Sequence, residues 1–146
     1  MLKHLLIILL LLPLRAQAEG PDRVSILLGS RHYGADGFQE VNPGLFLTWE
    51  RDMDISIGVF RNSYNKAAIA ATVAVPVVEW DQGNISLFAG AAYYPEDGRL
   101  QKIHLGDVIP IGGIQARHKD IFFQLTPLDG DPVKGLLAFG VTWAID

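Results

Sequence analysis

The sequence predicts an all-β protein: an eight-stranded antiparallel up-and-down transmembrane β-barrel after a signal peptide. Three observations support this. The chain contains eight short stretches in which large apolar residues alternate with small or mildly polar ones. A β-strand needs only about 9–11 residues to cross a bilayer. After residue 18, no run reaches the roughly 20 apolar residues that a membrane-spanning helix needs. The N-terminal segment carries a secretion signal.

That signal occupies residues 1–18. Lys3 and His4 form a short basic start, Leu5–Leu14 is an apolar run, and Ala16-Gln17-Ala18 is a small-x-small cleavage site. The apolar run is too short to span a bilayer as a helix. We therefore expect an exported protein in which residues 19–146 form one barrel domain.

Composition excludes several kinds of function. Without Lys3 and Arg15, 10 of the 12 basic residues remain against 16 acidic ones, a formal net charge of −6. Nucleic-acid binding needs clustered Lys and Arg, so nucleic acid is not an expected partner. The chain has no cysteine. Disulfides, a thiolate nucleophile and a cysteine metal site are therefore excluded.

The first four strands are expected at Val24–His32, Gly44–Arg51, Asp54–Arg61 and Ala67–Val78. Alternation is clear in the second, where Leu45, Leu47 and Trp49 share one face. In the fourth strand, Ile69 and Val73 face one way while alanines and Thr72 face the other.

The last four strands are expected at Asn84–Tyr94, within Ile103–Arg117, at Asp120–Thr126 and at Gly135–Ile145. The sixth is the least regular, because Pro110 and Gly112-Gly113 indicate a bulge or bend. The eighth is the clearest, with Leu137, Phe139 and Val141 on one face.

The chemical character of the two faces favours a barrel in lipid. The outer face of a soluble sandwich meets water and usually carries charge. Here the second face of strands four, five and eight consists mainly of Ala, Gly, Ser and Thr. Such residues suit the narrow interior of an eight-stranded barrel, which side chains nearly fill, and this disfavours a pore. The large residues would then face lipid. A soluble secreted β-protein is the alternative fold.

Turn lengths and aromatic residues orient the barrel. The turns at Arg51–Asp54, Trp80–Gly83 and Arg117–Asp120 are short and are expected in the periplasm. Longer connections are expected outside the cell, at His32–Pro43, Asn62–Lys66, Pro95–Lys102 and Pro127–Lys134. The three tryptophans fall at the first end and the four tyrosines at the second, as two interfacial girdles would. We expect a bacterial outer-membrane location.

The extracellular rim carries the candidate site. Ser63 could act as nucleophile, His32 as base and Glu40 as orienting acid, by the general logic of catalytic triads. The expected substrate-binding residues are Arg61, Asn62, Asn42 and Tyr94. Arg61 suits bidentate binding of phosphate or carboxylate. A rim at the outer-leaflet headgroups would meet a lipid or lipopolysaccharide. Metal and nucleotide motifs are missing, so no cofactor is expected.

The alternative is a non-enzymatic structural or interaction barrel, of the adhesion or envelope-resistance type. Rim loops are polar because they meet water, and Asn62-Ser63 is also a common turn sequence. In either case we expect a monomer that depends on barrel-assembly machinery during biogenesis.

In size and loop chemistry the chain resembles small outer-membrane barrels that act on lipid A. The palmitoyltransferases of that group are similar in placing a histidine in the first extracellular loop and an acid–serine pair in the second. His32 and Asn62-Ser63 occupy comparable places here, although Asn62 is not an acid and the amphipathic N-terminal helix of those enzymes is missing. The lipid A deacylases carry His-x-Ser, whereas this chain has the reverse order, Ser30-Arg31-His32. The resemblance implies an acyl-modifying activity on an outer-leaflet lipid.

Overall fold

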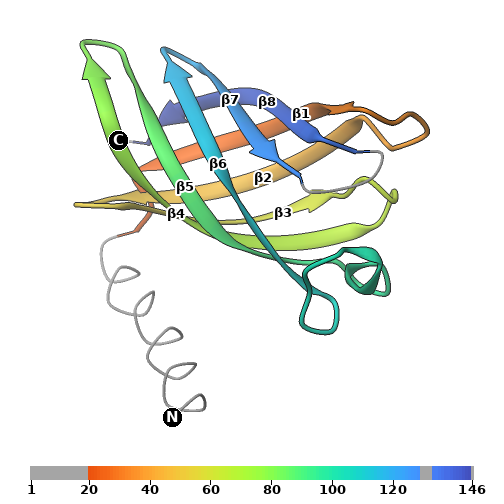
Figure 1. Cartoon of the computed structure of the whole chain (residues 1–146). Helices are drawn as coiled ribbons and strands as arrows, with labels where there is room; N and C mark the ends of the chain where they lie inside the picture. Colours follow the sequence, from red (N-terminus) through yellow and green to blue (C-terminus); the bar gives the residue numbers. More distant parts are fainter. Residues whose placement is uncertain (1–19, 129–132, 146) are drawn as a thin grey trace.

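A computed structural model describes residues 20–128 and 133–145, so the predicted signal peptide lies outside the described residues. The strands close into one antiparallel barrel in which each strand pairs with its sequence neighbours and β8 returns to β1 (Figure 1). They are β1 (Arg23–Tyr33), β2 (Val41–Glu50), β3 (Asp54–Arg61), β4 (Ala67–Trp80), β5 (Gly83–Tyr93), β6 (Val108–His118), β7 (Ile121–Pro127) and β8 (Gly135–Ala144). The predicted fold class is confirmed. The described residues include no helix long and apolar enough to cross a membrane.

The predicted strand boundaries differ most from the observed ones at two places. Strand β2 begins at Val41, so Asn42 and Pro43, which were expected in a loop, are part of the strand. Strand β6 begins at Val108, and the connection before it contains the 3-10 helix η2 (Gly98–Leu100). The β5–β6 loop is therefore longer than the predicted Pro95–Lys102 segment.

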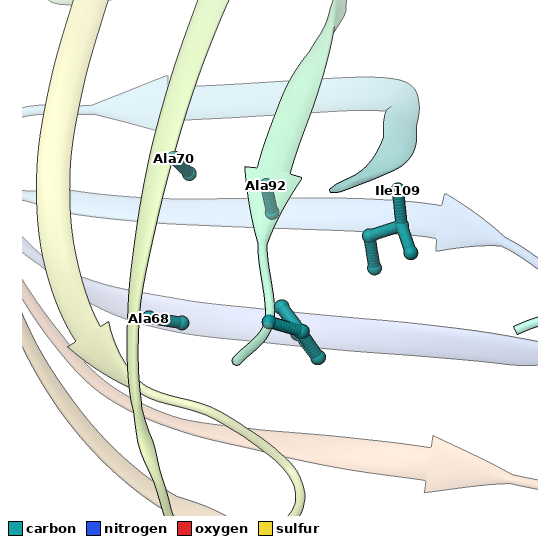
Figure 2. Close-up of a cluster of buried hydrophobic side chains, with 5 residues drawn as sticks. Ala68, Ala70, Ala92 and Ile109 are labelled. Atoms are coloured by element: carbon teal, nitrogen blue, oxygen red, sulfur yellow. The ribbon is translucent and has the colours of Figure 1, made fainter. Parts of the chain in front are cut away.

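Alternation places small residues inside the barrel, as predicted. On β4, Ala68, Ala70 and Ala74 are buried, whereas Ile69 and Val73 are exposed on the outer wall. Figure 2 shows that Ala68 and Ala70 share one interior region with Ala92 of β5 and Ile109 of β6. This arrangement leaves a large apolar outer wall and fits a membrane barrel.

A β-bulge interrupts this alternation in β1. Leu27 lies opposite Gly140 of β8, and Gly29 lies opposite the next residue of β8, Phe139, so Leu28 is the extra residue. Side chains alternate with a period of two, so one extra residue reverses the facing of everything beyond it. Ser30 and His32 consequently point inward and are buried.

The ladder between β6 and β7 is incomplete. Strand β6 pairs with β5 along its whole length, from His118 to Val108. Its pairing with β7 runs only from His118 to Ile114 among the described residues. The irregularity predicted at Pro110 and Gly112-Gly113 therefore affects the pairing of β6 with β7, whereas the register of β6 with β5 is unbroken. Pro127, near the end of this seam, has no N–H to continue the ladder.

The interior is not filled, contrary to the expectation that side chains would nearly fill it. It encloses a cavity of about 930 Å³. Alanine, serine and glycine at inward positions leave this space because they project little volume from the wall. Eight strands are wide enough to hold one small ligand when the inward side chains are small.

The tryptophans and tyrosines lie near the two ends of the barrel as predicted, but not all of them are exposed. Trp80 and Trp143 lie exposed near the short-turn end, and Tyr33 and Tyr93 lie exposed at the ends of their strands on the long-loop side. Trp49 and Tyr94 are both buried, and Tyr64 lines the cavity. Four of the seven aromatic residues are therefore both near a barrel end and exposed, as the predicted girdles require, and the other three are buried or line the cavity.

Candidate functional site

Two of the predicted catalytic residues meet at the long-loop end of the cavity. Nε2 of His32, on β1, lies 2.9 Å from Oγ of Ser63, in the β3–β4 loop. The imidazole stacks on Phe38, with ring centroids 4.4 Å apart. His32 is buried, and both it and Ser63 line the cavity. A serine hydroxyl bonded to a held imidazole is the basic unit of nucleophilic acyl transfer.

Glu40 lies next to this pair without completing a hydrogen-bonded triad. Its Oε1 is 4.0 Å from Nδ1 of His32 and accepts a hydrogen bond of 3.2 Å from the His32 backbone N–H. Its other oxygen, Oε2, lies 3.9 Å from the guanidinium of Arg31. Nδ1 of His32 is buried with no hydrogen-bond partner among the described residues. Glu40 is thus placed to orient the imidazole after a small movement. Catalytic hydrogen bonds are often long in the free enzyme and shorten when substrate binds.

Asn62 shapes the loop that carries Ser63. Its side-chain Oδ1 accepts hydrogen bonds from the backbone N–H groups of Tyr64 and Lys66, at 2.9 and 3.1 Å. This is the Asx-type capping that lets a short turn satisfy its own backbone. Asn62 is only 1 % exposed and lines the cavity.

The other polar residues predicted to bind substrate divide into two groups. Asn42 is buried and fully engaged, because it accepts from Ser30 Oγ and donates to the backbone oxygens of Gln39 and Arg61. It ties β1, β2 and β3 together beneath the site. Arg61 occupies an outward-facing position of β3, and its side chain is exposed and does not line the cavity. The structure therefore separates Arg61 from His32 and Ser63.

Tyr94 belongs to the site and lies just beyond the end of β5. Its ring packs edge-on against Phe60 and Tyr64. Burial raises the pKa of Tyr94 to about 12, an effect that Tyr64 reinforces and the hydroxyl of Ser63 opposes. The phenol is therefore protonated at physiological pH and stands beside the candidate nucleophile.

The cavity wall below the site is mainly apolar. Large inward side chains from six strands line it, namely Leu27, Phe46, Phe60, Phe88, Ile109 and Phe122. At the opposite end, Arg23, Asp54 and Arg117 line it. Glu50 is 3.2 Å from the guanidinium of Arg117 and also bonds Arg23. The space is therefore a hydrophobic pocket with a polar rim and a charged floor.

Contacts between loops hold the rim together. Lys66 lies 2.9 Å from both Glu96 and Asp97, so the β3–β4 loop is linked to the β5–β6 loop. Hydrogen bonds to these two carboxylates raise the pKa of Lys66. Nε2 of Gln101 donates to the hydroxyl of Tyr64 at 3.0 Å.

Sequence reasoning missed Phe38 and the apolar pocket. Nothing in the sequence marks Phe38, because its contact with His32 depends on how the β1–β2 loop folds back. The pocket did leave a signal: Phe46, Phe60 and Phe88 fall on the otherwise small inward faces of their strands. Large apolar residues on both faces of a barrel strand indicate an apolar interior.

A comparison of the chain with protein-family models and with curated proteins gave no match. The fold and the site themselves define a class of protein: an eight-stranded barrel with a histidine–serine pair at its rim, above an internal pocket.

Proposed function

We propose that this protein is an outer-membrane enzyme that transfers or removes an acyl chain of lipid A or another outer-leaflet lipid. The observation that carries the proposal is the position of the His32–Ser63 pair at the mouth of an apolar cavity of about 930 Å³. A nucleophile alone would fit many substrates. A nucleophile above an apolar pocket fits an ester whose acyl chain can occupy that pocket.

The chemistry follows from the two side chains. Ser63 Oγ attacks the ester carbonyl while Nε2 of His32 takes the hydroxyl proton. When the tetrahedral intermediate collapses, the bond to the lipid alcohol breaks and that alcohol receives the proton from His32. The acyl group is then an ester of Ser63. A second hydroxyl, from another lipid or from water, attacks the acyl-serine by the same steps in reverse order.

The incomplete β6–β7 seam supports access from within a bilayer. Along most strands the cavity is lined by alternate residues, but on β6 the consecutive residues Ile109, Pro110, Ile111 and Gly112 all line it. Pro127 of β7 lines it from the other side of the seam. The wall is therefore thin or open where the ladder is unpaired, and a chain in the bilayer could enter sideways.

Exposed apolar residues continue this path outside the barrel. Leu100, Ile103 and Leu105 of the β5–β6 loop have large exposed fractions, and the first two also line the cavity. The loop leads directly into the unpaired half of β6. Such a surface lowers the cost of moving an acyl chain between lipid and pocket.

The test is expression in a Gram-negative host followed by mass spectrometry of lipid A and total phospholipid. The expected result is a mass change equal to one acyl chain, which His32→Ala and Ser63→Ala each abolish while heat-modifiable gel mobility is retained. Arg61→Ala should leave the change in place, because this side chain faces away from the pocket. Unchanged spectra with the wild-type protein would refute the proposal and favour a non-enzymatic interaction barrel.

A further inference from the structure

The orientation of the Asn62 side chain is fixed by its neighbours. Two backbone N–H groups, of Tyr64 and Lys66, point at one end of its amide. Two N–H donors can be accepted only by the amide oxygen, so Oδ1 must face the backbone N–H groups of Tyr64 and Lys66 and Nδ2 must point the other way. The position of Nδ2 follows from hydrogen bonding alone.

Nδ2 of Asn62 has no hydrogen-bond partner among the described residues, although it is buried. An unpaired buried amide group costs about 1–3 kcal/mol, and native proteins keep few of them. Asn62 also lines the cavity and immediately precedes Ser63. A buried donor without a partner among the described residues, on a residue that lines a pocket and precedes a nucleophile in the sequence, indicates that a ligand oxygen is its partner.

We infer that the side-chain amide of Asn62 is the oxyanion donor for the reaction of Ser63, an inference that rests on the proposed function. When Ser63 Oγ attacks an ester, negative charge develops on the former carbonyl oxygen. An N–H donor within reach of that oxygen stabilises the charge more than it stabilises the neutral carbonyl. Because Nδ2 is already shielded from water, it needs little reorganisation to act.

The neutral amide is essential to this role. Aspartate at position 62 would keep a carboxylate oxygen for the two backbone N–H groups but would lose the donor and place a negative charge where the oxyanion forms. If position 62 instead served as an acid that assists His32, aspartate would raise activity. The single substitution Asn62→Asp therefore separates the two roles by the sign of its effect.

The experiment measures hydrolysis of p-nitrophenyl decanoate in detergent micelles by wild type, Asn62→Asp and the matched control Asn65→Asp. Asn65 lies exposed in the same loop, so its substitution adds the same charge away from the pocket. Removal of one oxyanion donor costs about 10²–10³-fold in kcat. The expected result is a fall of that size for Asn62→Asp, with KM within about twofold and with the control unchanged.

A second measurement needs no lipid substrate. A fluorophosphonate probe should label Ser63 of the wild type, fail with Ser63→Ala, and label Asn62→Asp more slowly by a similar factor. Heat-modifiable gel mobility checks that each variant is folded. Full activity or a gain of activity in a folded Asn62→Asp variant, with an active wild type, overturns this inference and leaves the proposed function standing. A wild type without ester hydrolysis, probe labelling or lipid modification overturns both.

Discussion

Nε2 of His32 and Oγ of Ser63 lie 2.9 Å apart although 31 positions separate the two residues in the sequence. Backbone hydrogen bonds around the two residues maintain this distance. The N–H of Gln39 donates to the carbonyl oxygen of Ser63 at 3.0 Å, and the N–H of Ser30 donates to the carbonyl oxygen of Glu40 at 2.9 Å. The β1–β2 loop that follows His32 is thus hydrogen-bonded both to β1 itself and to the β3–β4 loop that carries Ser63.

The substitution Glu40→Gln tests whether the carboxylate orients His32. A glutamine amide at this position can still accept from the His32 backbone N–H but has no negative charge to stabilise an imidazolium. The expected result is a fall in kcat of about 10- to 100-fold, smaller than the loss on removing the base itself. The measurement is steady-state ester hydrolysis, and an unchanged kcat would remove Glu40 from the site.

Ala70→Phe should reduce the length of acyl chain that the protein accepts. Ala70 is buried and lines the cavity, so a phenyl ring there occupies space that an acyl chain would use. Its neighbour Ala71 is exposed on the outer wall. Ala71→Phe is therefore the matched control. Rates with p-nitrophenyl esters of increasing chain length should shift toward short chains for Ala70→Phe alone, and equal profiles for both variants would contradict the pocket assignment.

Arg117→Met should destabilise the barrel without changing the site. Arg117 pairs with Glu50 at the cavity floor and lies 3.9 Å from the buried carboxylate of Asp54. Removal of one partner of a buried ion pair typically costs about 3–5 kcal/mol. Here Asp54 stays buried without Arg117, whereas Glu50 keeps its bond to Arg23, so the expected cost lies at the lower end of that range. Urea unfolding in detergent measures this loss.

An exposed ion pair provides the control for that loss. Arg51 pairs with Asp22 at the surface, and an exposed pair contributes about 0–1 kcal/mol. Asp22→Asn should therefore shift the unfolding midpoint much less than Arg117→Met does. Equal shifts would show that the floor cluster does not behave as a buried network.

Gly90→Ala should also destabilise the barrel, through the backbone of β4. A Cβ at position 90 would lie 2.0 Å from the carbonyl oxygen of Ala71 and 2.7 Å from the Cα of Thr72. Overpacking of this kind costs about 1–3 kcal/mol. At Gly135, the nearest atom to a new Cβ is the Thr126 oxygen, 3.6 Å away, so Gly135→Ala should be neutral. The two unfolding curves in urea are directly comparable.

Periodicity was sufficient to predict the eight strands and most of their facings, because alternation is a local property of sequence. The pairing of His32 with Ser63 was proposed from their shared rim, and the geometry agrees. The outward position of Arg61 also follows from alternation, since Phe60 and Asn62 face inward on either side of it. The partial β6–β7 ladder and the contact with Phe38 depend on pairing between distant segments, so they could not be predicted locally.

The extra residue in β1 has a genetic consequence. Leu27 and Gly29 already lie opposite consecutive residues of β8, so a chain without Leu28 would continue as a regular ladder with Ser30 and His32 still facing the cavity. An in-frame loss of this one codon should therefore spare the orientation of the histidine. In the regular ladder of β4, by contrast, loss of Ala71 would reverse the facing of every residue on one side of it. Mutational scans that include single-residue deletions should accordingly find position 28 far more tolerant of deletion than position 71.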